Sequence, residues 1–391
     1  MGKGRKATVA STDKLEEPAP AAHKASERRL SLVIMCRNEE ARIATALRSA
    51  KSIADEVVIY DTGSTDSTIE KVFEVCPEAK VYTGKFVNFV ESYNAALDHV
   101  RTSHVLMLAA DESFASQEGA LAVRRYFDSG GNMLDMTVKD FDPAGRYLSE
   151  MVRNRLFPSS KRYAGPYTHE YIPVGSGERV DLMPSVHHIH HCPGKTKEQE
   201  RTRMEQDIVV LKQYIEDNRK SLGPDIIRAN FYLHKSYTIL QQYEEAKQYA
   251  DLVRAFLSGQ NHMFVNQIDF DESHTAYEKT QDLDVWRKTT LRNPSCPALS
   301  AMYGMTALEA GEFEIAKAAL KRAIALPRNV GTKLLADNPA LCFDFPLGGL
   351  AEIAHREGDL LSTSLYLNIL SAVNPGYCEQ LKQKMIHLIN W

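Results

Sequence analysis

Three clusters of polar residues in the first third of the chain carry groups that bind charged ligands. They are Arg37–Glu40, Asp61–Asp66 and the pair Asp111 and Glu112. Carboxylate oxygens are the hard ligands that Mg²⁺ and Mn²⁺ prefer, and arginine pairs with phosphate. Asp61–Asp66 has a simpler alternative, because the same residue types also make an ordinary N-terminal helix cap.

A further group of candidate ligands lies near residue 190, where four of five consecutive residues are histidines. Neutral imidazole is a good ligand for Mn²⁺ and a better one for Zn²⁺. In an extended strand His188 and His190 share one face. We expect one of His188, His190 or His191 to hold a metal ion together with Asp111. The alternative is a set of surface and structural histidines.

The elements that must position these clusters alternate between strand and helix. Short apolar runs typical of buried strands cover residues 30–36, 57–60, 79–82 and 105–108, and helical periodicity separates them. This order predicts an α/β domain with a mostly parallel, Rossmann-like sheet. Ligands of such sheets bind at the carboxyl ends of the strands, where the polar clusters stand. We therefore expect the clusters to converge on one crevice.

From about Gly194 onward the pattern becomes helical throughout. Three segments share a template in which an apolar helix leads through a short turn to a second helix, at residues 231–250, 303–327 and 349–375. This template is typical of tetratricopeptide-like repeats, and residues 258–296 fit no copy of it. We predict a disordered tail at 1–28, the α/β domain at 29–194 and an all-α helical-repeat domain at 195–391.

Composition excludes several classes of protein. The 391 residues carry a formal net charge of -4, which demands no polyanionic partner. No apolar run approaches the roughly 18 residues that a membrane span needs. The six cysteines are scattered, without framework spacing. These features predict a cytoplasmic protein with reduced thiols, in the host cytoplasm if it is phage-encoded.

Three strings of the sequence carry a family resemblance: SLVIMCRNEEARIATALRSAKSIADEVVIYDTGSTDST, FVNFVESYNAALDHV and VLMLAADE. Together they resemble the family-2 glycosyltransferases of GT-A fold. The similarity is closest to the cytosolic bacterial and phage-type subgroup that carries tetratricopeptide-like repeats. The resemblance implies a GT-A domain that transfers a sugar from a nucleotide-sugar donor, with UDP-sugars favoured. The acceptor would be a hydroxyl or thiol, and the transfer would proceed with inversion.

The resemblance also implies which residues bind the donor. Asp61 would accept from the uracil or the ribose, and the same nucleoside would be flanked by Arg37, Asn38, Glu39 and Gly63. The donor diphosphate needs a divalent cation, Mn²⁺ or Mg²⁺, to neutralise its charge as it leaves. The family holds this cation with an Asp-x-Asp motif, of which Asp111 is the aspartate that remains here.

Two positions depart from the family pattern. Ala109 replaces the first aspartate of the metal motif, which puts the metal dependence in question. Tyr93 stands where an arginine is common, so a cation for the phosphates is missing from the preceding helix. Arg153, Arg155 or Lys161 would supply that charge instead.

An inverting transfer needs a base that deprotonates the acceptor. Glu170 is the only carboxylate between residues 163 and 174, the segment expected to line the acceptor side, and it belongs to a His-Glu pair typical of the subgroup. It is the first candidate for the base, and Asp140 and Asp142 are the second. Alternatively, Glu170 positions the substrate without accepting a proton.

The helical repeats favour a macromolecular acceptor, because they present concave surfaces to extended partners. Such an acceptor is a peptide or protein, a glycan, or modified DNA of phage type. Basic helix residues would follow DNA phosphates or form ordinary solvated faces; they are Arg287, Lys288, Arg292, Lys317, Lys321, Arg322 and Arg328.

Two other functions are alternatives to sugar transfer. A nucleotidyltransferase would need a Gly-rich phosphate loop with a basic residue after the first strand, where this chain has Arg-Asn-Glu-Glu. A non-catalytic repeat scaffold with a decayed transferase domain is the other alternative. Ala109 is the evidence for it.

Overall fold

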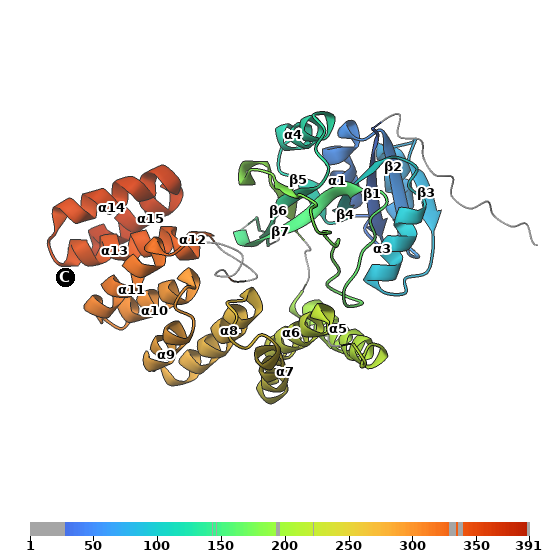
Figure 1. Cartoon of the computed structure of the whole chain (residues 1–391). Helices are drawn as coiled ribbons and strands as arrows, with labels where there is room; N and C mark the ends of the chain where they lie inside the picture. The colour runs from blue at the N-terminus through green and yellow to red at the C-terminus, as the bar shows by residue number, and fades with distance from the viewer. Residues whose placement is uncertain are drawn as a thin grey trace, which may run out of the picture.

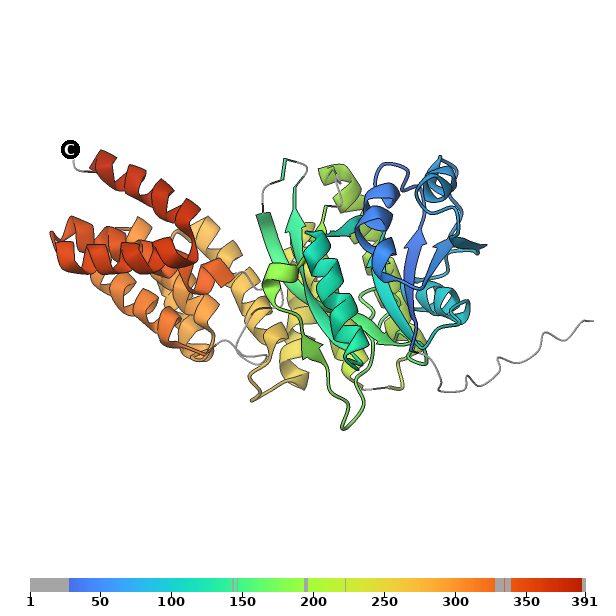
Figure 2. The ribbon, with the colours of Figure 1, turned by 90° about the horizontal axis from the view of Figure 1, so that it is seen from above.

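The computed structural model describes residues 28–142, 144–145, 147–192, 196–221, 223–327, 334 and 339–388. These residues form a sheet with helices on both faces, followed by an array of helices that leads away from it (Figure 1). Seen from above, the last helices lie at the end of the molecule farthest from the sheet (Figure 2). Apart from Arg28, the predicted disordered tail lies outside the described residues.

One mixed sheet forms the centre of the N-terminal part. Its strands within the described residues are β1 (Leu30–Cys36), β2 (Glu56–Asp61), β3 (Lys80–Thr83), β4 (His104–Ala109), β5 (Glu112–Phe114), β6 (Leu134–Phe141), β7 (Tyr147–Pro158), β8 (Asp181–Leu182) and β9 (Ile189–His191). The strand order is β3-β2-β1-β4-β7-β6-β9-β5, and β8 pairs with β6.

The first four strands confirm the four that the apolar runs predict, each to within one residue. β1 pairs in parallel with both β2 and β4, and β2 pairs in parallel with β3. Strand order therefore reverses at β1, which is where ligands of such sheets bind. The predicted α/β class is confirmed. The sheet also has antiparallel pairs, because β7 runs against both β4 and β6.

Two apolar layers attach helices to the sheet. One face is covered by α1 (Ile43–Ala50), α2 (Thr68–Val75) and α4 (Gln117–Asp128). The other face is covered by α3 (Phe89–Asp98), together with Tyr163 and Ile172 of the loop after β7. Short 3-10 helices lie at Lys51–Ile53 and Ser185–His187. The loop after β7 thus belongs to the core of the sheet domain.

Within the described residues the chain after β9 is entirely helical, as predicted. The helices are α5 (Lys197–Asp217), α6 (Pro224–Ile239), α7 (Tyr243–Phe256), α8 (Met263–Thr280), α9 (Asp284–Arg292), α10 (Pro297–Glu309), α11 (Phe313–Ala325), α12 (Pro339–Cys342), α13 (Asp344–Arg356), α14 (Leu360–Val373) and α15 (Pro375–Leu388). The pairs α6–α7, α10–α11 and α13–α14 coincide with the three predicted copies. Their assignment to the tetratricopeptide class stays a prediction.

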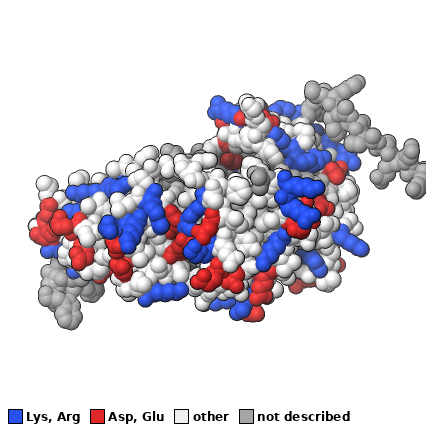
Figure 3. Space-filling view, turned by 60° about the horizontal axis from the view of Figure 1, so that its bottom comes forward, with Lys and Arg blue, Asp and Glu red and all other residues white. Residues whose placement is uncertain are grey.

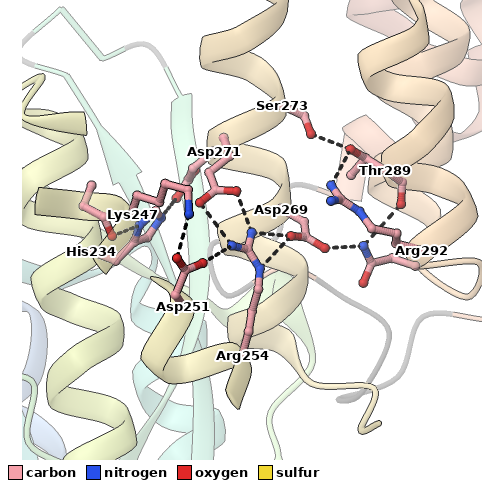
Figure 4. A network of polar contacts seen from close by, with 12 residues as sticks. His234, Lys247, Asp251, Arg254, Asp269, Asp271, Ser273, Thr289 and Arg292 are labelled. Atoms are coloured by element: carbon pink, nitrogen blue, oxygen red, sulfur yellow. Dashed lines mark hydrogen bonds and ion pairs between the residues drawn. The ribbon is translucent and has the colours of Figure 1, made fainter. Parts of the chain in front are cut away.

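Helices α8 and α9 fill the stretch that fits no predicted copy. The buried residues of α8 include the polar side chains of Asn266, Gln267, Asp269 and Ser273. Asp269 accepts from Arg254 of α7, and Ser273 shares a 2.6 Å hydrogen bond with Thr289 of α9 (Figure 4). Because its buried residues mix these polar side chains with the apolar Phe264 and Ile268, α8 lacks the apolar periodicity by which a helical repeat is found in a sequence.

The junction between the two parts falls at residues 193–195, outside the described residues, so the predicted boundary at 194/195 stays a prediction. On its far side, Thr196 and Gln199 form a capping box that starts α5. No helix among the described residues combines the length and apolarity needed to cross a membrane. Within the described residues none of the six cysteines forms a disulfide bond.

Candidate functional site

The loops after β1 and β2 are joined by side-chain hydrogen bonds at the carboxyl edge of the sheet. Asp61 ends β2 and is buried, and its carboxylate accepts from the Ser64 N–H at 3.0 Å and the Ser64 hydroxyl at 2.6 Å. The Ser64 hydroxyl accepts from the Asn38 N–H at 3.0 Å. The Asn38 side chain accepts from the Thr65 N–H at 2.8 Å. Asp61 is therefore fixed in one orientation beside the first loop.

Two left-handed backbone positions shape this edge. Asn38 has a φ of 55°, and Gly63 has a φ of 105°. Asparagine tolerates the left-handed region better than most residues, whereas the Gly63 conformation is open mainly to glycine. A Cβ at Gly63 would meet nothing within 4 Å, so the backbone, not crowding, requires glycine there. Arg37 and Gly63 are both exposed at this edge.

A second group of charged side chains lies at the end of β4. Strand β9 pairs with β5 and β6, and this pairing brings His191 between Asp111 and Asp140. The His191 Nδ1 lies 2.7 Å from Asp140 Oδ1, and its Nε2 lies 3.4 Å from Asp111 Oδ2. The two carboxylates thus contact opposite nitrogens of one imidazole ring.

This pairing sets the charges of the three groups. Burial works against ionisation of Asp111, but the hydrogen bond and charge of His191, with Arg42, lower the pKa of Asp111 to about 2. Burial also disfavours the imidazolium, yet the hydrogen bonds to Asp111 and Asp140 raise the pKa of His191 to about 9. Two carboxylates and one imidazolium carry a net negative charge that attracts a cation, and a metal ion that binds the His191 Nε2 must displace the proton of that nitrogen.

The other candidate histidines point elsewhere. The Nε2 atoms of His188, which precedes β9, and His190, which lies in it, are 2.9 Å apart. His188 Nδ1 also bonds the Ser185 carbonyl at 3.0 Å, and the His190 ring packs against Phe141. Within the described part of the chain no three metal-binding side chains converge on one point. Asp111 and His191 are the candidate ligands that the structure brings together.

The three candidate phosphate-binding cations differ in their surroundings. Arg155 is buried and forms an ion pair with Glu112. Lys161 forms an ion pair with Glu178 and donates to a backbone carbonyl. Arg153 is exposed on β7. Of the three, Arg153 has the side chain that a soluble donor can reach without breaking an ion pair.

Glu170 lies in the loop after β7 and is half-buried. Burial and then the charge of Glu170 raise the pKa of Tyr93, a residue of α3 that lies close to it. The neighbouring His169 is neutral, because burial and nearby arginines lower its pKa well below the usual value. Asp142 is engaged in the β6–β7 turn, where its carboxylate accepts from the Ala144 N–H at 2.9 Å.

Sequence reasoning missed one residue of the edge and the partners of the Glu170 loop. Arg42, at the start of α1, forms an ion pair of 2.7 Å with Glu39 and lies near Asp111. Arg42 follows Glu39 by three residues where a helix begins, and this spacing predicts an ion pair between them. Arg228 and Tyr232 of α6 contact His169. No local sequence pattern predicts a contact between residues that are about sixty positions apart in the chain.

Ligands of open α/β sheets bind at the carboxyl ends of the strands, which is where Asp61 and Asp111 lie. Residues 31–177 match the family model described as "Glycosyl transferase family 2". This part of the chain is therefore a family-2 glycosyltransferase domain.

Curated relatives agree with this assignment. The chain is 34% identical over 90 residues to an uncharacterized glycosyltransferase of Rickettsia typhi and 32% identical over 90 residues to one of Rickettsia bellii. Each match covers 23% of this chain and 30% of the relative. The chain thus spans less than a third of the length of these relatives.

Two solved structures are also similar. S. aureus TarS 1-349 in complex with UDP-GlcNAc is 13% identical, with 68% of this chain and 93% of that chain covered and a TM-score of 0.37. Glucosyl-3-phosphoglycerate synthase from Mycobacterium tuberculosis in complex with Mn²⁺ and UDP-glucose is 23% identical. That match covers 30% of this chain and 45% of the other, with a TM-score of 0.24.

Proposed function

We propose that the protein is a glycosyltransferase that moves a sugar from a nucleotide-sugar donor, with UDP-sugars favoured, to a hydroxyl or thiol of an acceptor. The observation that carries the proposal is the Asp111–His191 pair at the end of β4, in a family-2 glycosyltransferase domain. The fixed Asp61 carboxylate lies at the end of β2, on the other side of β1, and would recognise the nucleoside.

The donor binds along the carboxyl edge of the sheet. Asp61 accepts a hydrogen bond from the uracil or the ribose, and Arg37, Asn38, Glu39 and Gly63 flank the nucleoside. Arg153 attracts the diphosphate, the role that the family commonly gives to an arginine at the position of Tyr93. Arg155 stays in its ion pair with Glu112 and does not contact the diphosphate directly.

A divalent ion, Mn²⁺ or Mg²⁺, fits the ligand chemistry of Asp111 and His191. Such ions are commonly held by one or two protein ligands together with phosphate oxygens and waters, so two side chains suffice despite Ala109. The carboxylate of Asp140 orients His191 from its other nitrogen, as outer carboxylates do at many metal sites. When bound, the ion neutralises the charge of the departing diphosphate.

Transfer with inversion forms the bond from the acceptor oxygen or sulfur to the anomeric carbon as the bond from that carbon to the diphosphate breaks. Glu170 takes the proton that the acceptor loses. Glu170→Gln therefore keeps donor affinity and lowers turnover by ~10²–10⁴-fold, the usual contribution of a general base. Asp140 is the weaker candidate because it already binds His191, and Asp142 because it binds a turn.

The helical region binds a macromolecular acceptor in this proposal, and a peptide or glycan fits it better than modified DNA. Positive and negative side chains alternate over the face drawn in Figure 3, without one continuous basic stripe. Arg287 and Lys288 both pair with Asp284, and Lys317 pairs with Glu314 and Glu357. Arg328 lies outside the described residues.

The test is a screen of UDP- and GDP-sugars with the full chain and Mn²⁺, followed by mass analysis of peptide, glycan and hydroxymethylated-DNA acceptors. We expect release of the nucleoside diphosphate from one donor and loss of that release in Asp111→Ala. A product with the inverted anomeric configuration supports the single-base mechanism, and a retained configuration rules it out. Absence of turnover with every donor would favour the non-catalytic scaffold.

A further inference from the structure

The loop that carries Glu170 is held on one side by the sheet domain. Ala164 and Tyr171 exchange two backbone hydrogen bonds of 2.9 Å, which close the loop between them. Asn94 of α3 bonds both backbone groups of Tyr163, at 2.8 and 3.0 Å. The Tyr167 carbonyl accepts from the N–H of Phe89 at 2.9 Å. The two ends of the loop and its middle are therefore anchored to the catalytic domain.

Helices α5 and α6 hold the opposite side of the same loop. The Arg228 Nε donates to the His169 carbonyl at 2.9 Å. The His169 ring stacks on Tyr232, with ring centroids 3.5 Å apart and 3° between the ring planes. The hydroxyl groups of Tyr167 and Tyr171 donate to Asp217 at 2.9 Å and to Asp225 at 3.0 Å.

These contacts bracket Glu170 and maintain an unfavourable backbone conformation. His169 has a φ of 62°, a left-handed conformation that is unfavourable for a residue other than glycine. Such a conformation persists only where its surroundings hold it. The bond from Arg228 falls on the carbonyl of the peptide group that joins His169 to Glu170. Removing it frees the residue that determines where the Glu170 side chain points.

We propose that Arg228 is a positioning residue for the transfer reaction, and that α5 and α6 complete the acceptor side of the active site by holding the His169–Glu170 turn. This inference rests on the proposed function, in which Glu170 is the base. The helical region then has a second task besides binding the acceptor. It keeps Glu170 within reach of the proton that Glu170 accepts.

The experiment is a double-mutant cycle in the full chain with Arg228→Met, Glu170→Gln and the combined variant. A displacement of about 1 Å costs up to 10²-fold in rate, so we expect Arg228→Met to lower kcat by roughly 10–100-fold with the donor Kd unchanged. Because Arg228 acts through Glu170, the loss should nearly vanish in the Glu170→Gln background. Arg228→Gln keeps an N–H donor and should recover part of the rate.

Hydrogen exchange supplies a readout that does not depend on activity. Residues 164–171 should exchange faster in Arg228→Met than in the wild type. Arg201→Ala, which removes an exposed arginine of α5, should leave both exchange and kcat unchanged. An equal loss of kcat in both Glu170 backgrounds, or unchanged loop exchange, would overturn the positioning role. If Glu170→Gln is fully active, the base assignment fails by itself, and loop exchange alone then decides whether Arg228 holds the turn.

Discussion

His191 lies between two carboxylates, and its two ring nitrogens have different partners. Nδ1 bonds Asp140 at 2.7 Å, while Nε2 faces Asp111 at 3.4 Å. In metal sites an outer carboxylate commonly fixes the tautomer and direction of a ligating imidazole. At the scale of single residues, this arrangement supports Asp140 as the residue that orients a metal ligand.

Substituting His191 and His190 in turn tests which of these two histidines binds the metal ion. We expect His191→Ala to weaken Mn²⁺ binding in the presence of UDP by at least about tenfold, and Asp140→Asn to weaken it by ~10–100-fold. His190→Ala is the matched control, because His190 bonds His188 and should leave Mn²⁺ affinity unchanged. Calorimetric titration measures all three. Equal losses in the two histidine variants would remove His191 from the metal site.

Asp61 combines a local bond to Ser64 with its proposed contact to the nucleoside. We expect Asp61→Ala to weaken UDP binding by ~1.5–3 kcal/mol, the size of a lost charged hydrogen bond. Ser64→Ala removes the local hydroxyl contact but keeps the carboxylate, so it should bind UDP nearly as well as the wild type. Calorimetry with both variants distinguishes recognition from loop structure. If both lose affinity equally, Asp61 acts by shaping the loop.

At the scale of elements, α8 is held in the helical array by buried charges. Arg254 of α7 contacts Asp269 at 2.5 Å and Glu272 at 2.6 Å, and the Asp269 side chain is only 5% exposed. The Asn293 side chain also donates to Asp269. Leaving a buried carboxylate without its cation lowers the stability of the fold far more than an exposed ion pair raises it.

This difference predicts that replacing an arginine and replacing a lysine on α7 will change the free energy of unfolding by unequal amounts. Arg254→Ala should lower the free energy of unfolding by about 3 kcal/mol, because it leaves Asp269 buried beside one amide partner. Lys247 pairs with Asp251 on the exposed side of the same helix, so Lys247→Ala should produce no measurable change. Urea denaturation of the full chain measures both. Similar losses in the two variants would mean that the buried Arg254–Asp269 contact contributes no more stability than the exposed Lys247–Asp251 pair, both of which Figure 4 shows.

The elements that the sequence predicted well are those with apolar periodicity. β1, β2 and β4 are continuous buried runs, and α10, α11, α13 and α14 follow apolar spacing. The sequence allows an extended strand for His188 and His190, but three residues that include two histidines carry no pattern that sets the bounds of β9. Helix α8 likewise does not stand out as part of a repeat, because its buried residues mix polar and apolar side chains.

At the scale of the whole molecule, local patterns placed the polar clusters at strand ends but not the long-range contacts. The pairing of β9 with β5 selects His191 over its neighbours, and nothing near residue 190 encodes that register. The contact of Arg228 with His169 likewise depends on how α6 lies against the sheet domain. The sequence therefore predicts which residues gather at the carboxyl edge of the sheet, whereas their binding of the donor and the role of Glu170 on the acceptor side stay predictions.

In the proposed function, the edge formed by Asp61, Asp111 and His191 binds a nucleoside diphosphate together with a divalent ion. Calorimetry of UDP with the full chain, with and without Mn²⁺, tests it most directly in the wild type and in Asp111→Ala. We expect Mn²⁺ to strengthen UDP binding at least roughly tenfold in the wild type and to have no effect in Asp111→Ala. UDP binding that Mn²⁺ does not change in the wild type, or strengthens equally in both proteins, would contradict the account.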